Sequence, residues 1–290
     1  MLPSRHDHLP TMTVGVSFSD DPEWVLAKAQ QFLASEPVLH NLILTLLTAR
    51  VAHPEPGRYW VASVGDAVRG VAFQSPPTFA VTITPMPADV VMSLVDEIAQ
   101  ADVSLPGVMG DAATAATFAG QWAERRKAAA TPREGQRIYE LIELTDGSHA
   151  SGRLRKAASE DRDLIVRWLR GFQTDTGESG GSDVEALVDA RLPEGQYQIW
   201  EDGEPASMAS STPVIEGVSR IGAVYTPPDR RSRGYAEACV RELSRQLQAN
   251  GTRCMLYTQL SNPTSNSIYR RIGYVAIAEV LRYQFEESAS

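Results

Sequence analysis

The spacing of apolar and polar residues divides the first half of the chain into alternating helices and strands. Asp21-Pro22-Glu23 forms a favourable helix start, and the residues that follow, up to Leu33, place apolar side chains at helical spacing. Residues 59–63 and 68–73 read as two strands around a Gly65-Asp66 turn, which predicts a hairpin. The remaining elements predicted here are helices at 38–51 and 88–99, a helix that ends near Lys127, and strands at 79–83, ending at Val108, and at 137–144.

The second half repeats a similar order of elements. A second hairpin is predicted at residues 197–211 around Glu201-Asp202-Gly203. The other predicted elements are strands at 154–157, 221–226, 253–258 and 274–285, and helices starting at Asp161 and covering 183–192, 234–250 and 263–272. The echo between the halves indicates an internal duplication. We predict domains at 1–147 and 152–290, two α/β (α+β) copies of a mixed, mostly antiparallel central sheet flanked by helices, with residues 1–11 as a disordered lead-in.

Composition and charge exclude several classes of protein. The chain has 290 residues, of which 43% are hydrophobic and 22% charged, so each half can build a core. Its net charge of −9 argues against a nucleic-acid partner, and no apolar run is long enough for a membrane span. Residues 1–150 hold 10 Lys and Arg against 17 Asp and Glu, whereas residues 151–290 hold 17 against 19. The basic groups are therefore concentrated where a local anion site could form.

The two cysteines, Cys239 and Cys254, suggest neither a disulfide framework nor a metal site. They form no C-x-x-C pair, and two thiols cannot build a zinc site alone. We expect both to be small buried hydrophobes and predict no metal. The N-terminal residues lack the apolar run of a signal peptide, so the expected location is cytoplasmic.

The stretch Ile221–Ala236 (IGAVYTPPDRRSRGYA) is the clearest chemical motif. A predicted strand ends at Thr226, Pro227-Pro228 prevents both further pairing and helix, and an arginine-rich turn leads into an amphipathic helix. The first N–H groups of a helix are unsatisfied and carry a partial positive charge, which favours an anion. Gly234 and Ala236 leave the backbone open to close approach by a phosphate. The alternative is a solvated arginine-rich turn before an ordinary helix.

A second motif lies at residues 262–274 (NPTSNSIYRRIGY). Asn262 suits a helix N-cap, Pro263 the first helical position, and Gly273 the C-terminal stop. Asn262, Asn266 and Tyr269 share one helix face. A phenol is protonated at neutral pH, so Tyr269 could donate a proton to a leaving thiolate. The alternative is a half-buried aromatic side chain with its hydroxyl at the surface.

Together the two motifs resemble the GNAT superfamily of N-acetyltransferases over roughly residues 152–290. The resemblance rests on the R-x-x-G-x-A run at Arg231–Ala236 and the Asn262…Tyr269…Gly273-Tyr274 segment. It implies a cofactor site for acetyl-CoA, with pantetheine beside Val224, Thr226 and Asn262. The phosphates would be surrounded by five residues of the loop and helix start: Arg231, Arg233, Gly234, Tyr235 and Ala236.

The resemblance also implies direct attack by an amine on the thioester, with Tyr269 as general acid. Many family members carry a glutamate on the strand before the phosphate loop, but residues 218–226 contain no Asp or Glu. The base therefore stays open between Glu216, Tyr257 and a chain of water molecules. Cys254 as an acylated nucleophile is a further option that nothing nearby in sequence supports.

The expected acceptor is a primary amine of a small molecule or peptide. The protein itself is expected to be a monomer or a homodimer. We expect its pocket near Trp168 and Phe172, the loop at 174–182, and Tyr257. Two alternative functions remain: an acyl-CoA-binding module that does not catalyse, and transfer of another acyl or aminoacyl group.

The first half resembles the same family more faintly. At the position of a phosphate loop it reads ITPMPAD (Ile83–Asp89), with neither Gly nor Arg and with an acid that would repel phosphate. We therefore predict a degenerate N-terminal copy, as in mycothiol synthase and other tandem members of the family.

Overall fold

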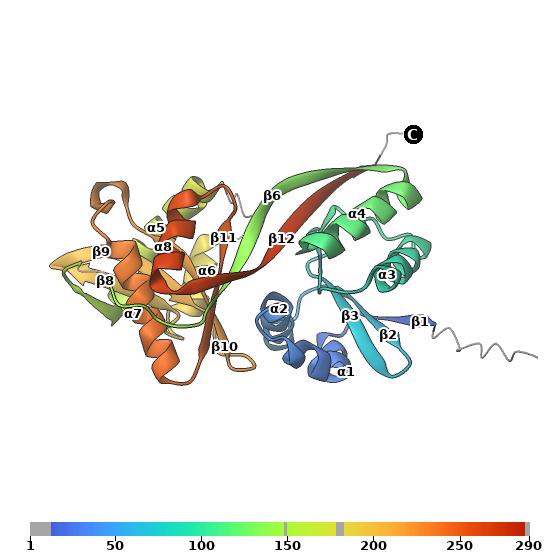
Figure 1. Ribbon diagram of the computed structural model, residues 1–290, viewed down its shortest axis with the longest axis horizontal. Coiled ribbons are helices and arrows are strands. Elements are labelled where there is room, and N and C mark those ends of the chain that lie inside the picture. Colours follow the sequence, from blue (N-terminus) through green and yellow to red (C-terminus); the bar gives the residue numbers. More distant parts are fainter. Residues whose placement is uncertain (1–12, 148–149, 178–182, 288–290) are drawn as a thin grey trace, which may run out of the picture. The chain divides into compact units, whose positions relative to one another are not determined.

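The computed structural model describes residues 13–147, 150–177 and 183–287 and divides into two compact units (Figure 1). Unit 1 consists of residues up to Glu36, Leu46–Arg133 and the segment from Leu281, and unit 2 of Pro37–Thr45 and Glu134–Val280. The division predicted at 147 to 152 stays a prediction about the two copies. The two compact units do not divide there: Pro37–Thr45, before that point, belongs to unit 2, and the segment from Leu281, after it, belongs to unit 1. The predicted lead-in at 1–11 lies outside the described residues.

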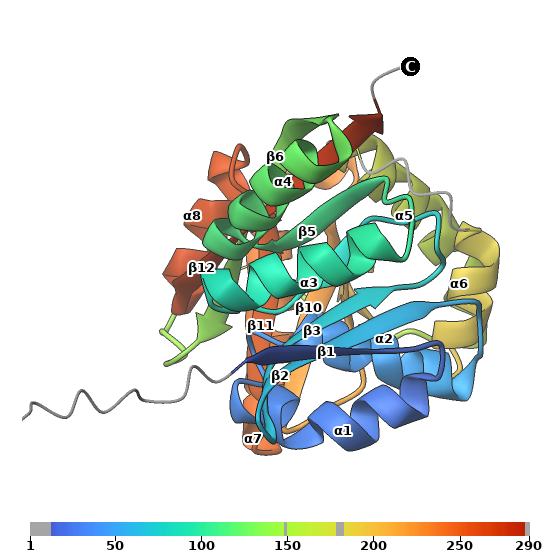
Figure 2. The same ribbon diagram turned by 90° about the vertical axis from the view of Figure 1, so that its right-hand side faces the viewer.

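Unit 1 is built on a mixed sheet in the order β1-β2-β3-β4-β5-β12-β6. Adjacent strands from β1 to β4 are antiparallel, and β4 and β5 are parallel. Figure 2 shows α3 and α4 side by side over these strands. The elements are β1 (Val14–Ser19), α1 (Pro22–Ser35), α2 (Asn41–Ala52), β2 (Arg58–Val64), β3 (Ala67–Gln74), β4 (Val81–Ile83), α3 (Ala88–Gln100), β5 (Gly107–Asp111), α4 (Ala112–Arg126) and β6 (Ala128–Leu141).

Unit 2 repeats this plan in the order β12-β6-β11-β10-β9-β8-β7. Strands β10 and β11 are parallel, whereas β7 to β10 and the β11–β6 pair are antiparallel. Its elements are β7 (Arg153–Lys156), η1 (Ser159–Asp161), α5 (Arg162–Thr176), α6 (Val184–Arg191), β8 (Tyr197–Asp202), β9 (Glu204–Ser211), β10 (Val218–Tyr225), η2 (Pro228–Arg230), α7 (Tyr235–Ala249), β11 (Arg253–Gln259), α8 (Pro263–Ile272) and β12 (Tyr274–Glu287). Among the described residues, the two strand orders are parts of one twelve-stranded mixed sheet, and this mixed sheet with its flanking helices confirms the predicted fold class.

Alternation along the strands of unit 2 gives its sheet two buried faces. On one face Ile221 and Leu256 pack with Cys239 of α7 and Ile272 of α8. On the other face the side chains of α5 and α6 pack against β8 and β9, with Ile165, Val188, Tyr197, Ile199 and Met208 in the cluster. Burial on both faces removes apolar area from water on each side of one sheet, which is the main stabilising term of such a layered fold.

Strands β6 and β12 have residues in both units and lie next to each other in the sheet order (Figure 1). In unit 1, Tyr283 and Phe285 of β12 join the core, and Phe285 stacks on Trp122. In unit 2, Ile138 and Tyr139 of β6 lie opposite β11. The part of the sheet in each unit is thus completed by residues of β6 and β12.

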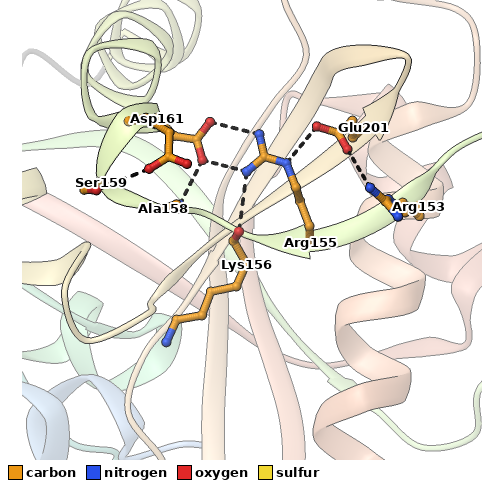
Figure 3. Close-up of polar contacts among 8 residues, drawn as sticks. Arg153, Arg155, Lys156, Ala158, Ser159, Asp161 and Glu201 are labelled. Carbon is orange, nitrogen blue, oxygen red and sulfur yellow. Dashed lines mark hydrogen bonds and ion pairs between the residues drawn. The ribbon is translucent and has the colours of Figure 1, made fainter.

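A cluster of ion pairs fastens β7 to the start of α5 (Figure 3). Arg155 donates from Nη1 and Nη2 to the Asp161 carboxylate at 2.6 and 2.9 Å, and from Nε to Glu201 at 2.8 Å. The Asp161 carboxylate also accepts from the Ala158 backbone N–H at 2.8 Å. These hydrogen bonds, first of all that from Arg155, lower the pKa of Asp161 although burial opposes the shift.

We expect Arg155→Gln to lower the free energy of unfolding by about 2 kcal/mol, because it leaves the buried Asp161 carboxylate without its cation. Because the pKa of Asp161 is lowered in the folded state, its ionised carboxylate stabilises the fold at any pH above the ordinary aspartate pKa of about 3.9. This contribution disappears as the pH falls through the lowered pKa of the folded state. Urea titrations from pH 7 to 3 test this expectation. A deficit that persists undiminished at the lowest pH would contradict it.

Candidate functional site

Strands β10 and β11 separate in the middle of the unit 2 sheet. Their parallel pairing runs from Val218 to Ile221, which lies opposite Leu256, although β10 continues to Tyr225 and β11 to Gln259. Beyond this point β10 stays paired with β9 through a bulge between Gly222 and Tyr225, and β11 stays paired with β6. Ala223 in the bulge has a φ of 47°, an uncommon conformation for a residue with a side chain. Beyond Ile221 and Leu256, the backbone groups of β10 and β11 that face each other are therefore not paired.

The helix that follows β10 begins without a side-chain cap. Its N-cap is Gly234, in the left-handed region with φ 79°, and among the described residues no side chain caps the helix. Helices α6 and α8, by contrast, are capped by the side chains of Asp183 and Asn262. The residues from Arg231 to Gly234 are exposed. In the described part of the chain, the first N–H groups of α7 therefore have no side-chain partner, and the positive end of the helix follows an exposed, arginine-containing turn.

The structure places the side chains predicted around the phosphates in different surroundings. Arg233 is exposed, whereas Arg231 pairs with Asp175 and donates from Nε to the Thr226 carbonyl at 3.0 Å. Tyr235 is buried, and its hydroxyl donates to Asp202 at 2.6 Å. Tyr235 can therefore contribute to an anion site only through its backbone. The same holds for half-buried Ala236, whose side chain is a methyl group.

The residues predicted beside pantetheine follow the separated strand. Val224 turns toward the α7 face of the sheet and packs against its core. The Thr226 hydroxyl lies 2.9 Å from the Ser207 hydroxyl of β9. Both side chains are thus engaged within the protein, which leaves their backbone groups as the means of contacting a ligand.

The second motif forms α8 with the bounds predicted for it. Asn262 accepts from the Ser265 backbone N–H at 3.0 Å and so caps the helix. Tyr269 is 7% exposed, and its ring lies between Tyr139 and Tyr274 at centroid distances of 6.4 and 6.1 Å. Burial raises the pKa of its phenol to about 12, so the group holds its proton at neutral pH. The phenol is buried rather than presented on a polar surface.

Asn266 shares the buried side of α8 with Tyr269. Its Nδ2 donates to the Gln259 and Asn262 carbonyls, and its Oδ1 accepts from the Tyr139 hydroxyl at 2.9 Å. This amide joins the end of β11, the start of α8 and β6. It holds the helix that carries Tyr269 in place against the separated strands.

The candidate bases and the candidate nucleophile differ in position. Glu216 is exposed in the turn before β10, five residues from Ile221, which is roughly 16 Å of extended chain. Burial raises the pKa of Tyr257, so this phenol does not accept a proton at neutral pH. Cys254 is fully buried and its pKa is raised to about 12, which makes it a poor nucleophile. Cys239 is buried as predicted.

The corresponding region of unit 1 has a different geometry. Strand β4 stays paired with β5 through its last residue, Ile83, which lies opposite Gly110. Helix α3 begins after Pro87, and Asp89 lies in its first turn. Thr84 forms three hydrogen bonds with Val71: its N–H donates to the Val71 carbonyl at 3.0 Å, its hydroxyl accepts from the Val71 N–H at 2.9 Å and donates to the same carbonyl at 3.4 Å. The strands of unit 1 do not separate at this point.

Two observations concern membranes and metals within residues 13–147, 150–177 and 183–287. None of the helices there has the length and hydrophobicity needed to cross a bilayer. No three side chains of the metal-binding types His, Cys, Asp and Glu gather there into a possible ligand set.

The predicted pocket residues are described in part. Trp168 of α5 is buried and its ring lies 6.4 Å from that of Tyr225 on β10. The predicted loop starts later than expected, because α5 continues to Thr176, and residues 178–182 lie outside the described residues.

Comparison with known proteins identifies the fold. Residues 202–283, which include β10, the phosphate-loop motif and α8, match the model of the family described as FR47-like protein. A GNAT-family acetyltransferase from Colwellia psychrerythraea superposes with a TM-score of 0.61 at 10% identity, covering 94% of this chain and all of that one. A GCN5-related N-acetyltransferase from Sphaerobacter thermophilus gives 0.64 at 14% identity and 96% coverage of both chains. No curated protein matches the sequence.

The fold is therefore that of the GNAT acetyltransferases, as the two motifs predicted. A tandem GNAT protein from the clavulanic acid biosynthesis pathway matches 95% of this chain and all of its own length, with a TM-score of 0.55 at 10% identity. The likeness thus extends over both units, and the family match lies in the second except for its last three residues, 281–283.

Proposed function

We propose that unit 2 is an N-acetyltransferase that transfers an acetyl group from acetyl-CoA to a primary amine of a small molecule or peptide. The observation that carries the proposal is the separation of β10 and β11 directly before an uncapped helix start. An extended thioester arm could pair with the free strand edge, while its pyrophosphate bonds to the first N–H groups of α7. The motif Arg231–Ala236 lies at this junction.

In this proposal each residue contributes through the group that the structure leaves available. Backbone groups of Val224 and Thr226 would pair with pantetheine, with Asn262 alongside. The backbone N–H groups of Tyr235 and Ala236 and the open backbone at Gly234 would hold the phosphates. Arg231 and Arg233 would add positive charge, Arg231 by leaving or sharing its Asp175 partner.

The chemistry follows from an unprotonated amine and a protonated phenol. The amine nitrogen attacks the thioester carbonyl carbon, the C–S bond breaks, and the leaving thiolate takes the proton of Tyr269. The proton lost by the amine passes to solvent, since β10 carries no carboxylate and Tyr257 keeps its own proton. Solvent then returns a proton to Tyr269, so the protein is unchanged after each cycle.

For unit 1 we propose a copy that has lost its CoA site. Paired strands β4 and β5 give an acyl-CoA arm no edge to join, and Asp89 in the first turn of α3 would repel a phosphate. The proposed setting is the cytoplasm, where the two free cysteines stay reduced.

Calorimetry with acetyl-CoA, followed by a thiol-release assay over a panel of amines, tests the proposal. We expect one acetyl-CoA per chain and turnover of at least one amine. Absence of acetyl-CoA binding would refute it. Binding with no turnover on any amine would favour the acyl-CoA-binding module, and turnover only with another acyl thioester would reassign the donor.

A further inference from the structure

Arg220 on β10 is a partly buried arginine that has no carboxylate partner among the described residues. Its Nη1 donates to the Asn41 side-chain oxygen at 3.2 Å and more weakly to the Thr45 hydroxyl at 3.4 Å. Its guanidinium lies 5.9 Å from the centre of the Tyr257 ring. These are neutral partners, and none of them balances the positive charge.

The electrostatic surroundings of Arg220 make its charge unfavourable as the structure stands. Burial lowers the pKa of Arg220; the neighbouring Tyr257 opposes this shift, and Arg191 adds to it. Arg155 in the same unit shows the opposite arrangement, because Asp161 and Glu201 both pair with it and raise its pKa. A desolvated cation without a counter-ion destabilises the fold, so its presence calls for an anion that the described residues do not supply.

The amide of Asn41 gives an independent indication of a missing ligand. Asn41 is 0% exposed, and its Nδ2 has no hydrogen-bond partner in the part of the chain that the structure describes. Its Oδ1 is the atom that accepts from Arg220, so the unsatisfied donor belongs to the same group of side chains. At one place, therefore, a guanidinium lacks a counter-ion and a buried amide N–H lacks an acceptor.

This pair lies beside the proposed reaction centre. Arg220 directly precedes Ile221, the last residue of β10 that pairs with β11, and Tyr257 directly follows Leu256, its counterpart on β11. Because Ile221 and Leu256 face α7, the side chains of Arg220 and Tyr257 occupy the opposite face. An acceptor that approaches the separated strands from that face would meet Arg220 first.

We propose that Arg220 and the Asn41 amide bind a carboxylate of the acceptor, so that the substrate class is amines that also carry a carboxylate, such as amino acids. The inference rests on the proposed acetyl transfer and specifies its acceptor. A guanidinium and an amide N–H offer a carboxylate parallel donors, and a charged hydrogen bond of this kind holds the acceptor at a fixed distance from the thioester.

The test is calorimetric titration of the CoA-saturated protein with N-acetyl amino acids and with their matched carboxamides, which lack the charge. These compounds are the products of the proposed reaction, so binding needs no turnover. We expect at least one acid to bind 10- to 100-fold more tightly than its amide, the range of one charged hydrogen bond. Arg220→Gln should abolish that preference while acetyl-CoA affinity stays within about twofold.

Thermal unfolding separates a binding role from a structural one. We expect Arg220→Met to melt at or above the wild-type temperature, because it removes an unpaired cation. The matched control, Arg155→Gln, should melt lower and keep the acid-over-amide preference. The proposal is overturned if no acid is preferred over its amide, or if Arg220→Met melts as low as Arg155→Gln. Failure of CoA itself to bind would refute the proposed function instead, and the same acids titrated without CoA would still test Arg220.

Discussion

Gly234→Asp should weaken acetyl-CoA binding by at least about 100-fold, or about 2.7 kcal/mol. The substitution places a carboxylate at the first N–H groups of α7, where the proposed site holds the pyrophosphate. A Cβ at this position would meet the Ala150 side chain at 3.7 Å, an ordinary contact, but the φ of 79° strains any residue other than glycine, so the loss has an electrostatic part and a backbone part. Isothermal titration at low and high salt measures the loss of affinity. Added salt should reduce the difference in affinity between the wild type and the variant, because it screens the repulsion between the carboxylate and the pyrophosphate.

Gly234→Asn is the matched control for this experiment. Asparagine has nearly the shape of aspartate and tolerates the left-handed backbone better than other residues, so it shares the strain at φ 79° without the charge. We expect it to weaken binding by less than about tenfold. If the Asp and Asn variants lose equal acetyl-CoA affinity, the loss comes from backbone strain. If the Asp variant keeps its affinity, the phosphates bind elsewhere.

Tyr269→Phe should lower kcat by about 100-fold and leave acetyl-CoA affinity unchanged, because it removes the proposed proton donor to the thiolate and keeps the ring. With a pKa of about 12, the wild-type phenol stays protonated throughout the usual assay range, so its ionisation should produce no alkaline loss of activity below about pH 10. Steady-state rates of thiol release across pH, beside calorimetry, provide both measurements.

Tyr274→Phe is the control for the loss of a buried hydroxyl. Tyr274 is 2% exposed, touches the Tyr269 ring, and bonds through its hydroxyl to the Ser244 hydroxyl at 2.8 Å. Removal of the Tyr274 hydroxyl should lower the free energy of unfolding by about 1 kcal/mol and change kcat by less than about threefold. If both variants keep wild-type kcat, Tyr269 is not the acid; if both lose it equally, the loss reflects packing.

The elements that sequence patterns predicted well are those with strong local signals. Helix α8 has the predicted bounds, because Asn262-Pro263 starts it and Gly273 ends it with a φ of 112°. Strand β1 escaped prediction, since none of its six residues is buried: four are half-buried and two are exposed. Strand β6 begins at Ala128, nine residues before its predicted start, through a polar stretch that contains Pro132 and Gly135. Its strand conformation depends on neighbours distant in sequence, which local patterns do not encode.

For the candidate site, the sequence located the motif but not the state of its side chains. The inward direction of Tyr235 and the engaged hydroxyl of Thr226 depend on β8 and β9, which precede them in the chain by about 20 to 30 residues. Arg220 carried a signal that could have been used, because a lone arginine stands in an otherwise uncharged strand, VSRIGAVY. Its partner Asn41 lies far away in sequence, so only the fold brings the unsatisfied amide to it.

The sharing of β6 and β12 determines when this protein can fold during translation. The unit 1 sheet needs β12 between β5 and β6, and the segment from Leu281 leaves the ribosome only after all of Glu134–Val280. The first unit in sequence therefore cannot finish before the second has been made, and the nascent chain must keep the edges of β5 and β6 from pairing with other molecules meanwhile. Cutting the gene at the apparent midpoint would separate each sheet from one of its own strands.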